Sequence, residues 1–579
     1  MNPSRREAIG AFAGGVIAAA ATVAAAQVTT PPTSLSTSSS SPSSFPVSIE
    51  VDLNKRLGPL HPIWRFFGCD EPNYAYMKDG RRLLGELGKL GPTNAFFRTH
   101  NLLTSGDGTP ALKWGSTNVY TEDAGGQPVY DWRIVDRIFD TYLARNVKPY
   151  VQIGFMPEAL SRKPQPYQHE WRPGVKYDAI YTGWAHPPRD YAKWGELVFQ
   201  WARHCVERYG KGECESWYWQ IWNEPNIGYW QGTPEEFYQL HDVAVDAVRR
   251  ALPTARVGGC DTAGHGGAFM RGLLEHCLRG TNHATGKTGT PIDFVSFHAK
   301  GCPSFVDGHV RLGIAAQLRT IDEGFKLIAS FPQLKRKPIV IGESDPDGCA
   351  ACQGKQLGYR NGTMYSSYTA ATFARKFLLA DKHGVNLDGA LTWAFEFEDQ
   401  PYFAGQRVLS SNAIALPVLN VFRMCGKMSG DRVAVISSGE VPMDVIIKDG
   451  VRGATADVAA LASAADGKVF VLAWHYHDDD VPGPAAQVEL KLKDLPAGDG
   501  DAWRVAQYRI DQTHSNAHTL WKRFDSPSAT TPEQYEQLRQ AGELAKVGDA
   551  APVDIAGGIA TLAFTLPRQA VALFAFERA

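Results

Sequence analysis

Trp217-Tyr218-Trp219-Gln220-Ile221-Trp222-Asn223-Glu224-Pro225-Asn226 is an apolar, aromatic-rich run that ends abruptly in an amide, a carboxylate and a proline. A run this apolar predicts a buried strand of the kind found in parallel sheets. In a parallel barrel the chemistry takes place where the strands end. Glu224 is therefore a candidate catalytic carboxylate.

The segment from about Pro62 to Gly430 alternates short apolar runs with amphipathic helical patterns, which is typical of parallel βα units. Eight such units in roughly 370 residues predict a (β/α)8 barrel with enlarged loops. A doubly wound open sheet is the alternative, but no Gly-x-Gly-x-x-Gly opens a helix after an early strand. The expected barrel strands are Trp64–Phe67, Ala95–Thr99, Pro149–Gly154, Trp217–Trp222, Arg256–Gly259, Phe294–Phe297, Ile339–Gly342 and Ala390–Phe395.

Capping signals mark the helices between these strands. Thr233-Pro234-Glu235-Glu236 forms a capping box with proline at the first helical position, and an apolar stripe follows as far as Leu252. Asp131 precedes a second run in which aromatic and aliphatic residues recur every three or four positions. Both patterns predict helices that pack against the barrel.

After Gly430 the pattern changes to short strands separated by Gly, Asp and Pro turns, which predicts a β-sandwich over residues 431–579. The alternating strand Phe45–Leu53 stands apart from the barrel, so residues 46–60 are expected to complete this sandwich, with the barrel spanning 61–430. Residues 475–480, two histidines and three aspartates among them, are interpreted as a charged turn tip rather than a metal site. The segment 525–547 is polar and partly helical. The expected sandwich strands are Arg432–Ser437, Val445–Lys448, Val469–Tyr476, Val488–Leu492, Val505–Arg509 and Ala560–Phe576 in two parts.

The first 26 residues are similar to a twin-arginine export signal. Arg5-Arg6 precedes a weakly apolar, Ala/Gly-rich stretch that closes on small residues. A membrane-spanning helix is the alternative, but its glycines and small side chains make a poor span. Residues 27–45 form a Ser/Thr/Pro-rich linker. We expect a periplasmic or secreted protein, in which Cys349 and Cys352 form either a loop disulfide or two buried thiols.

Composition excludes some classes of partner. The 579 residues carry a net charge of -2, so no excess of basic charge favours binding to nucleic acid or to an anionic membrane. The 15 Trp, 21 Tyr and 27 Phe would suit the C–H faces of sugars, although ordinary core packing accounts for most of them. We expect no nucleic-acid partner and, after export, no membrane partner.

A second carboxylate follows the seventh predicted strand. Glu343 ends the otherwise uncharged run Pro338–Gly342, and strands four and seven face each other across a barrel mouth. Cleaving a glycosidic bond with retention requires such a pair, with one group protonating the leaving oxygen and the other attacking the anomeric carbon. A lone glutamate at either place would be interpreted as a solvated or salt-bridged strand end. Trp219 and Trp222 are expected to help raise the pKa of Glu224 by desolvation.

Several short motifs together resemble glycoside hydrolase family 39, the β-xylosidase and α-L-iduronidase family, and within it the bacterial β-xylosidases most. The resemblance runs from about Val47 to the C-terminus, and Asn-Glu-Pro alone specifies only the wider clan. The motifs that carry it are Trp222-Asn223-Glu224-Pro225-Asn226, Phe155-Met156-Pro157, Arg98-Thr99-His100, Ser296-Phe297-His298, Trp393, Tyr508-Arg509-Ile510-Asp511, His514-Ser515-Asn516-Ala517 and Trp521.

The resemblance implies roles for individual residues. Glu224 would be the acid/base, Glu343 the nucleophile, and Asn223 would bind the sugar 2-hydroxyl. His100 and His298 would hold hydroxyls of the terminal sugar, with Trp393 as the floor of its subsite. The expected substrate-binding residues are Asn223, His100, His298, Lys300, Phe155, Trp393 and Glu398.

This chain departs from the family pattern at three places that line the expected pocket. Ala299-Lys300 follows His298 where a tyrosine is common, the segment from Trp393 to Glu398-Asp399 is about two residues short, and residues 344–349 follow Glu343 in place of an aromatic-and-Asn continuation. Lys300 would suit a substrate carboxylate, but pairing with Glu343 or Asp345, or extension to solvent, is the favoured interpretation.

These patterns, together with the family resemblance, predict an exported, two-domain retaining exo-glycosidase. The resemblance implies that it removes β-D-xylose from short oligosaccharides by a double displacement. No metal or organic cofactor is required by this mechanism. The alternatives within the enzyme class are an α-L-arabinosidase and an α-L-iduronidase-like enzyme. From another class, an inactive barrel that binds carbohydrate is the alternative, although a binding module has no need of both glutamates.

Overall fold

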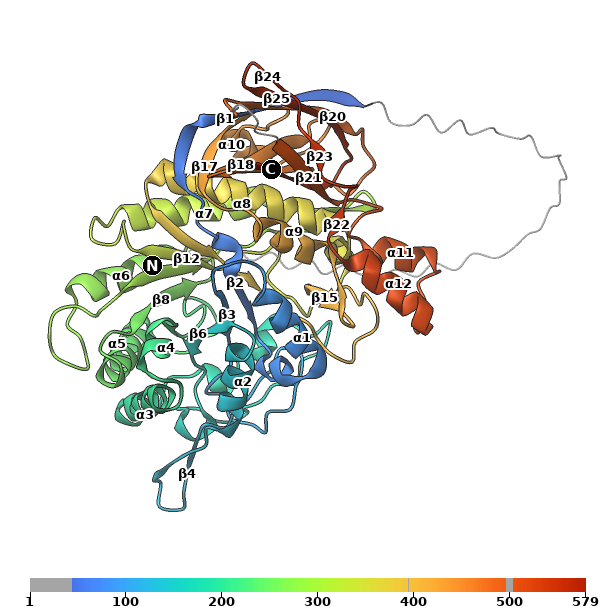
Figure 1. Ribbon diagram of the computed structural model, residues 1–579. Coiled ribbons are helices and arrows are strands. Elements are labelled where there is room, and N and C mark those ends of the chain that lie inside the picture. Colours follow the sequence, from blue (N-terminus) through green and yellow to red (C-terminus); the bar gives the residue numbers. More distant parts are fainter. Residues whose placement is uncertain (1–43, 394, 496–502, 579) are drawn as a thin grey trace, which may run out of the picture. The chain divides into compact units, whose positions relative to one another are not determined.

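The eight predicted barrel strands form one parallel sheet in the computed structural model, which describes residues 44–393, 395–495 and 503–578 (Figure 1). The strands appear in the sheet in chain order, as successive βα units require. Their bounds are β2 Phe66–Cys69, β3 Ala95–Thr99, β6 Val147–Ile153, β7 Tyr218–Ile221, β8 Arg256–Thr262, β9 Phe294–His298, β12 Pro338–Glu343, β13 Asn386–Ala390 and β14 Thr392–Trp393.

The barrel closes through its eighth strand, which is divided at Leu391. β13 pairs with β12 through Pro338 and Asn386, and β14 pairs with β2 through Thr392 and Phe67. The single predicted strand at Ala390–Phe395 is therefore two short pieces, one for each neighbour. This closure places the carboxyl ends of β7 and β12, three strands apart, around one mouth.

Aromatic side chains fill the interior of the barrel beneath the carboxyl ends of its strands. Phe96 and Phe294 both meet the Tyr218 ring edge-on, each at a centroid distance of 5.0 Å. Trp393 belongs to the same buried cluster and lies where the strands reach their carboxyl ends, since it terminates β14. The strands therefore surround a packed core, and the polar residues at their carboxyl ends stand on it.

Helices surround the barrel as the sequence predicts. The predicted capping box is present at the start of α5. The Thr233 side chain accepts from the backbone N–H of Glu236, and the Glu236 side chain accepts from the backbone N–H of Thr233. The bounds are α1 Lys78–Leu87, α2 Arg133–Leu143, α3 Tyr191–Tyr209, α4 Lys211–Glu215, α5 Pro234–Ala251, α6 Gly267–Arg279, α7 Ile314–Ala329, α8 Thr363–His383 and α9 Pro417–Cys425.

A second, mixed sheet forms the C-terminal region and includes the N-terminal strand, as predicted. β1 (Phe45–Pro59) pairs antiparallel with β17 and parallel with β20, and Figure 1 shows this blue strand among the orange and red ones. The sheet folds over on itself, since Phe564 of β25 and Phe574 of β26 are 4.5 Å apart although distant in strand order. The main strands are β17 Asp431–Ser437, β18 Asp457–Ala465, β19 Lys468–Tyr476, β20 Ala486–Lys493, β21 Trp503–Ile510, β25 Ile559–Leu566 and β26 Val571–Arg578.

Three details of the sandwich differ from the sequence prediction. The predicted strand at Val445–Lys448 is part of a helix, α10 (Met443–Asp449), which begins directly after Pro442. The strand β18 was not expected because its Ala-rich run has weak strand propensity, and pairing with β19 along its whole length overrides that propensity. Residues 475–478 are buried rather than a solvated turn tip, and Asp478 accepts from Val451 N at 2.9 Å.

The barrel and the sandwich are joined by buried polar contacts. Arg375 of α8 donates to Asp457 of β18 at 2.7 Å and also pairs with Glu440. Between β21 and β25 the chain forms α11 (Ala517–Arg523) and α12 (Pro532–Gly542), and Trp521 packs on Phe403, ring centroids 5.1 Å apart. The sandwich thereby supports the loop that follows the eighth barrel strand.

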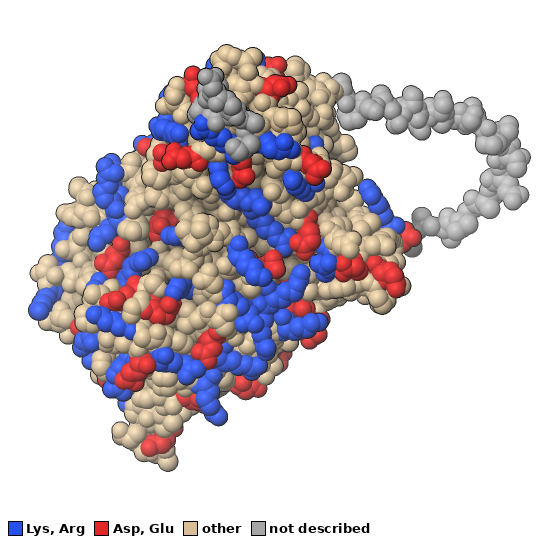
Figure 2. Space-filling model, viewed as in Figure 1, with Lys and Arg blue, Asp and Glu red and all other residues tan. Residues whose placement is uncertain are grey.

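Surface charge is mixed on the face shown in Figure 2. Lys and Arg gather there over the region where Figure 1 places α1, and a hollow beside α2 is lined by Arg81, Arg137 and Arg145 together with Asp136 and Asp140. The net charge did not reveal this local group.

Within the described ranges, no helix is both long and apolar enough to cross a bilayer. The predicted export signal and most of the linker lie outside the described residues.

The buried Arg375 pair predicts a large stability effect. Both Arg375 and Asp457 are almost fully buried, so Arg375→Ala would leave an uncompensated carboxylate in the interface. We expect the free energy of unfolding to fall by about 3–5 kcal/mol. Denaturant unfolding followed by tryptophan fluorescence measures this. Arg539→Ala, which removes an exposed ion pair on α12, should change the midpoint little, and an equally small change for Arg375→Ala would contradict the prediction.

Candidate active site

Glu224 and Glu343 meet at the barrel mouth. Glu224 lies three residues beyond β7, and Glu343 is the last residue of β12. A carboxylate oxygen of each, together with a ring nitrogen of His298, lies within 4.8 Å of the other two atoms. Both glutamates are almost buried, with 5% and 4% of their surface exposed. This spacing fits the roughly 5–5.5 Å between carboxyl groups of retaining glycosidases.

The backbone after β7 turns sharply to bring Glu224 into the mouth. Trp222 has φ 65° and Glu224 has φ 43°, both in the left-handed region that bulky residues rarely adopt. Glu224 N donates to Asp261 O at 2.8 Å, which ties this turn to the end of β8. Conformations of this kind cost about 1–3 kcal/mol each and concentrate at functional sites.

Lys300 bridges the two glutamates. Its Nζ is 2.7 Å from Glu224 Oε1 and 2.6 Å from Glu343 Oε2. With 19% of its side chain exposed, it is the most accessible member of the trio. Lys300 follows β9 by two residues, so the sixth strand supplies the cation between the carboxylates of the fourth and the seventh. Pairing with Glu343, one of the predicted alternatives, is therefore present, and Glu224 shares the same ammonium group.

A second layer of charge lies beneath this trio. His298 donates from Nδ1 to Glu224 Oε1 at 2.8 Å, and its Nε2 is 3.5 Å from Asp261. Arg98, which is fully buried, contacts Asp261 at 3.0 Å and Glu343 at 3.5 Å. Alternating positive and negative groups thus offset the cost of burying each one alone.

The neighbouring cations lower the pKa values of both glutamates. Burial alone would raise the pKa of Glu224, but Lys300 and His298 outweigh that effect and hold it below the ordinary value. The pKa of Glu343 is lowered in the same way, against the effects of burial and of nearby Glu224. The expected rise in the pKa of Glu224 is therefore wrong for this state. Trp219 lies outside the barrel against Trp201 and Trp217, so it does not surround the carboxylate.

Asn223 presents an unpaired donor beside Glu224. Its Oδ1 accepts from Arg98 at 2.8 Å, which fixes the amide orientation. Its buried Nδ2 has no hydrogen-bond partner among the described residues. An unsatisfied buried donor is costly unless a ligand completes it, so this geometry suits the predicted contact with a sugar hydroxyl.

His100, Phe155 and Trp393 line one side of the glutamate pair. The His100 ring is 4.4 Å from Trp393 and 5.4 Å from Phe155, and its Nε2 is 3.9 Å from Glu343. His100 Nδ1 in turn contacts Asp70 at 2.8 Å. These predicted residues converge with Asn223, His298 and Lys300, whereas Glu398 accepts from Asp79 N at 3.0 Å, beside the first turn of α1.

Three residues of the centre were not among the predicted site residues. Arg98 and Asp261 carry the second layer of charge, and Asp345 accepts from the backbone N–H of Trp393 at 2.7 Å. Arg98 belongs to a motif quoted for the resemblance, and Asp261 lies just beyond the predicted end of the fifth strand. Their position at strand ends was the available signal.

Two groups of side chains in the described part of the chain have the spacing of metal ligands. Glu224, His298 and Glu343 form one, but Lys300 already compensates its charge. In the other, the Nε2 of His276 and the Nδ1 of His283 both lie 2.9 Å from Asp242 Oδ2, in hydrogen bonds that satisfy the carboxylate.

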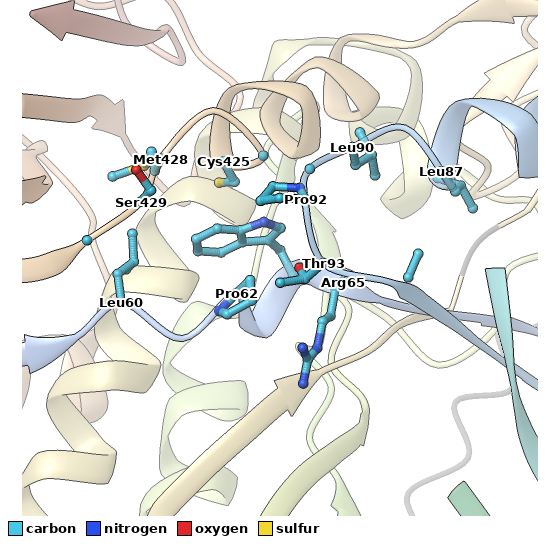
Figure 3. A pocket seen from close by; sticks show the side chains of 15 residues that line it. Leu60, Pro62, Arg65, Leu87, Leu90, Pro92, Thr93, Cys425, Met428 and Ser429 are labelled. Atoms are coloured by element: carbon cyan, nitrogen blue, oxygen red, sulfur yellow. The ribbon is translucent and has the colours of Figure 1, made fainter. Parts of the chain in front are cut away.

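An apolar cavity of about 150 Å³ lies away from this centre, at the amino-terminal ends of the first two barrel strands (Figure 3). Figure 3 shows Leu60, Leu90, Pro92 and Met428 around it. No group in its lining resembles the glutamate pair, and in such barrels the amino-terminal end contributes to stability rather than chemistry.

Comparisons with known proteins agree with this geometry. The sequence model of "Glycosyl hydrolases family 39" matches residues 47–558. The chain is 26% identical over 525 residues to a β-xylosidase of Caldicellulosiruptor saccharolyticus, covering 86% of this chain and 92% of that protein. It is 27% identical over 376 residues to human α-L-iduronidase, covering 60% of this chain and 55% of that protein. The crystal structure of the GH39 enzyme from Xanthomonas axonopodis pv. citri superposes with a TM-score of 0.70 at 22% identity, over 93% of this chain and 98% of that one.

The Lys300 bridge predicts a change in pH dependence. In the nucleophile role that the family resemblance implies, Glu343 must be ionised, and Lys300 helps to keep it ionised below the ordinary glutamate range. Lys300→Met should raise the pKa of Glu343 and move the acidic limb of kcat/KM to higher pH by about one to three pH units. The pH profile for a neutral nitrophenyl glycoside measures this shift. Lys382→Met, at an exposed ion pair on α8, is the control, and an unmoved acidic limb in Lys300→Met would contradict the prediction.

Proposed function

Because the chain belongs to glycosyl hydrolase family 39, we propose that it is a retaining exo-glycosidase that removes terminal β-D-xylose from short xylo-oligosaccharides. The observation that carries the reaction type is the spacing of Glu224 and Glu343, whose oxygens lie within 4.8 Å at the barrel mouth. The β-xylosidase of Caldicellulosiruptor saccharolyticus, matched over 92% of its length, supports the choice of sugar.

In the first step the ionised Glu343 attacks the anomeric carbon while Glu224 protonates the leaving oxygen. The lowered pKa of Glu343 suits this nucleophile. Asn223 Nδ2 would hydrogen-bond the sugar 2-hydroxyl, and Trp393 would support the apolar face of the ring. A glycosyl ester on Glu343 and a free alcohol result.

In the second step Glu224, now a carboxylate, takes a proton from water, which attacks the anomeric carbon and releases Glu343. The ester no longer carries the Glu343 charge, and His298, which donates to Glu224 at 2.8 Å, then helps to stabilise the negative charge of Glu224. His298 therefore supports the base form of Glu224 in this step.

The acid role of Glu224 requires a rearrangement before the first step. Its pKa is lowered while Lys300 lies 2.7 Å away, which disfavours the protonated form. A sugar seated between the carboxylates would separate Lys300 from Glu224 and restore the effect of burial, which raises the pKa. Substrate entry and activation of the acid would then be one event.

Lys300 also favours a second candidate, an exo-glycosidase for terminal uronides. A carboxylate on the sugar could draw the Lys300 ammonium away from the glutamates and pair with it. The similarity to human α-L-iduronidase supports this alternative, although the match spans 55% of that protein. An α-L-arabinosidase remains the third possibility in this class.

The remaining parts of the proposal concern location and partners. Arg5-Arg6 and the Ala/Gly-rich stretch that follows support export to the periplasm or beyond, where short plant-derived oligosaccharides would be the partners. We include no nucleic-acid or membrane partner, and the two-glutamate mechanism calls for no metal or organic cofactor.

A substrate panel tests the choice of sugar. Nitrophenyl β-D-xyloside, α-L-arabinosides and α-L-iduronide are compared by kcat/KM, with the xyloside expected to be the best by at least about tenfold. NMR of the first-formed sugar should show retained configuration. Preference for the iduronide would transfer the proposal to the uronide candidate, and turnover of none would contradict both.

Variants of the two glutamates test the roles. Glu343→Ala should abolish hydrolysis, because it removes the carboxylate that forms the ester in the proposed mechanism. Glu224→Ala should lower kcat/KM by about 10²–10⁴ for xylobiose but much less for dinitrophenyl xyloside, whose leaving group needs no proton. Full activity of Glu343→Ala, or an equal loss on both substrates for Glu224→Ala, would show that the roles are misassigned.

A further inference from the structure

The segment that follows Glu343 contains a disulfide that the proposed mechanism does not use. Cys349 and Cys352 form a disulfide, one of the two predicted alternatives, and it closes a loop of four residues. The loop begins six residues after Glu343 and departs from the family pattern, so its contacts are properties of this chain.

The closed loop presents its carbonyl groups to one buried arginine. The Arg360 guanidinium donates to the carbonyl oxygens of Cys349 at 2.7 Å, Ala350 at 3.2 Å and Cys352 at 2.5 Å. It also donates to Asp347 Oδ1 at 2.9 Å. Three carbonyls can converge on one cation only while the loop keeps its curvature, which the disulfide constrains.

The same loop anchors a second buried arginine. Ala350 O accepts from the backbone N–H of Arg407 at 2.8 Å. The Arg407 side chain lies 2.9 Å from Asp345 and 3.3 Å from Asp347. All four charged groups of this network are nearly buried, with two positive charges offsetting two negative ones, so each needs its partners in place.

This network holds the backbone of Trp393 from both sides. Asp345 Oδ2 accepts from Trp393 N at 2.7 Å, and Arg407 donates to Trp393 O. Asp345 O also accepts from Gly301 N at 2.9 Å, next to Lys300. The loop is thus connected through two arginines and two aspartates to the floor of the sugar subsite and to the bridging lysine.

We propose that the Cys349–Cys352 disulfide and Arg360 position Trp393 and the segment after Glu343 for catalysis, so that reducing the disulfide lowers activity reversibly. A dithiol supplies the two electrons and two protons: the S–S bond breaks, Cys349 and Cys352 each become thiols, and the dithiol becomes a cyclic disulfide. The freed loop can open, which weakens the Arg360 and Arg407 contacts. A displacement of about 1 Å at a reacting sugar can cost 10²-fold in rate.

The effect on activity rests on the proposed function, so the test has two readouts. The first is kcat and KM of the folded enzyme before reduction, after reduction with dithiothreitol, and after reoxidation. The second is hydrogen exchange of the Trp393 amide, which needs no substrate. Thiol titration verifies that two further thiols have formed, and exchange across β19 shows whether the fold is retained.

Reduction should lower kcat/KM at least about tenfold, with KM raised because Trp393 forms the subsite floor, and reoxidation should restore both. The Trp393 amide should exchange at least about tenfold faster while β19 stays protected. Cys349→Ser/Cys352→Ser should match the reduced enzyme and show no further change with dithiothreitol.

Reduced enzyme with unchanged Trp393 exchange would overturn the proposal. An unreduced enzyme that hydrolyses no glycoside would contradict the proposed function, while the exchange result would still decide this inference.

Discussion

Two carboxylates held side by side and almost out of water are the constraint on which this molecule depends. Glu224 and Glu343 repel each other, and burial adds to the cost of keeping both ionised. Lys300, His298 and Arg98 offset that cost, and Asp261 in turn balances Arg98. Since these groups come from the ends of different strands, the charge balance exists only when the barrel is closed.

The tertiary structure beyond the barrel serves this same cluster. The aromatic core beneath it supports Trp393 and the strand ends. The sandwich packs Trp521 on Phe403, in the loop that also carries Arg407. Arg407 then pairs with Asp345, two residues beyond Glu343. The C-terminal region is therefore connected through a loop to the segment behind Glu343.

Predictions from sequence were most successful where a pattern depends on local chemistry. Periodicity and turn residues predicted the eight strands, the capping box of Thr233 and Glu236, and the addition of β1 to the sandwich. They failed at Val445–Lys448, where a proline starts a helix, and at β18, where pairing overrides weak propensity. The family resemblance implied the site residues His100, Asn223 and His298, and Lys300 was noted as a departure from the family pattern. Glu398, which the resemblance also implied, accepts from the start of α1 instead.

Sequence alone indicated the family and predicted that Glu224 and Glu343 meet at one barrel mouth, because strand-end motifs carry that information locally. The ionisation of those glutamates was decided by tertiary structure. The pKa of Glu224 was expected to rise from neighbouring tryptophans, yet Lys300 and His298 lower it. His298 and Lys300 lie 74 and 76 positions, respectively, from Glu224 along the chain. Charge interactions depend on distance in space, and no spacing in the sequence specifies that an ammonium group will lie between the two carboxylates.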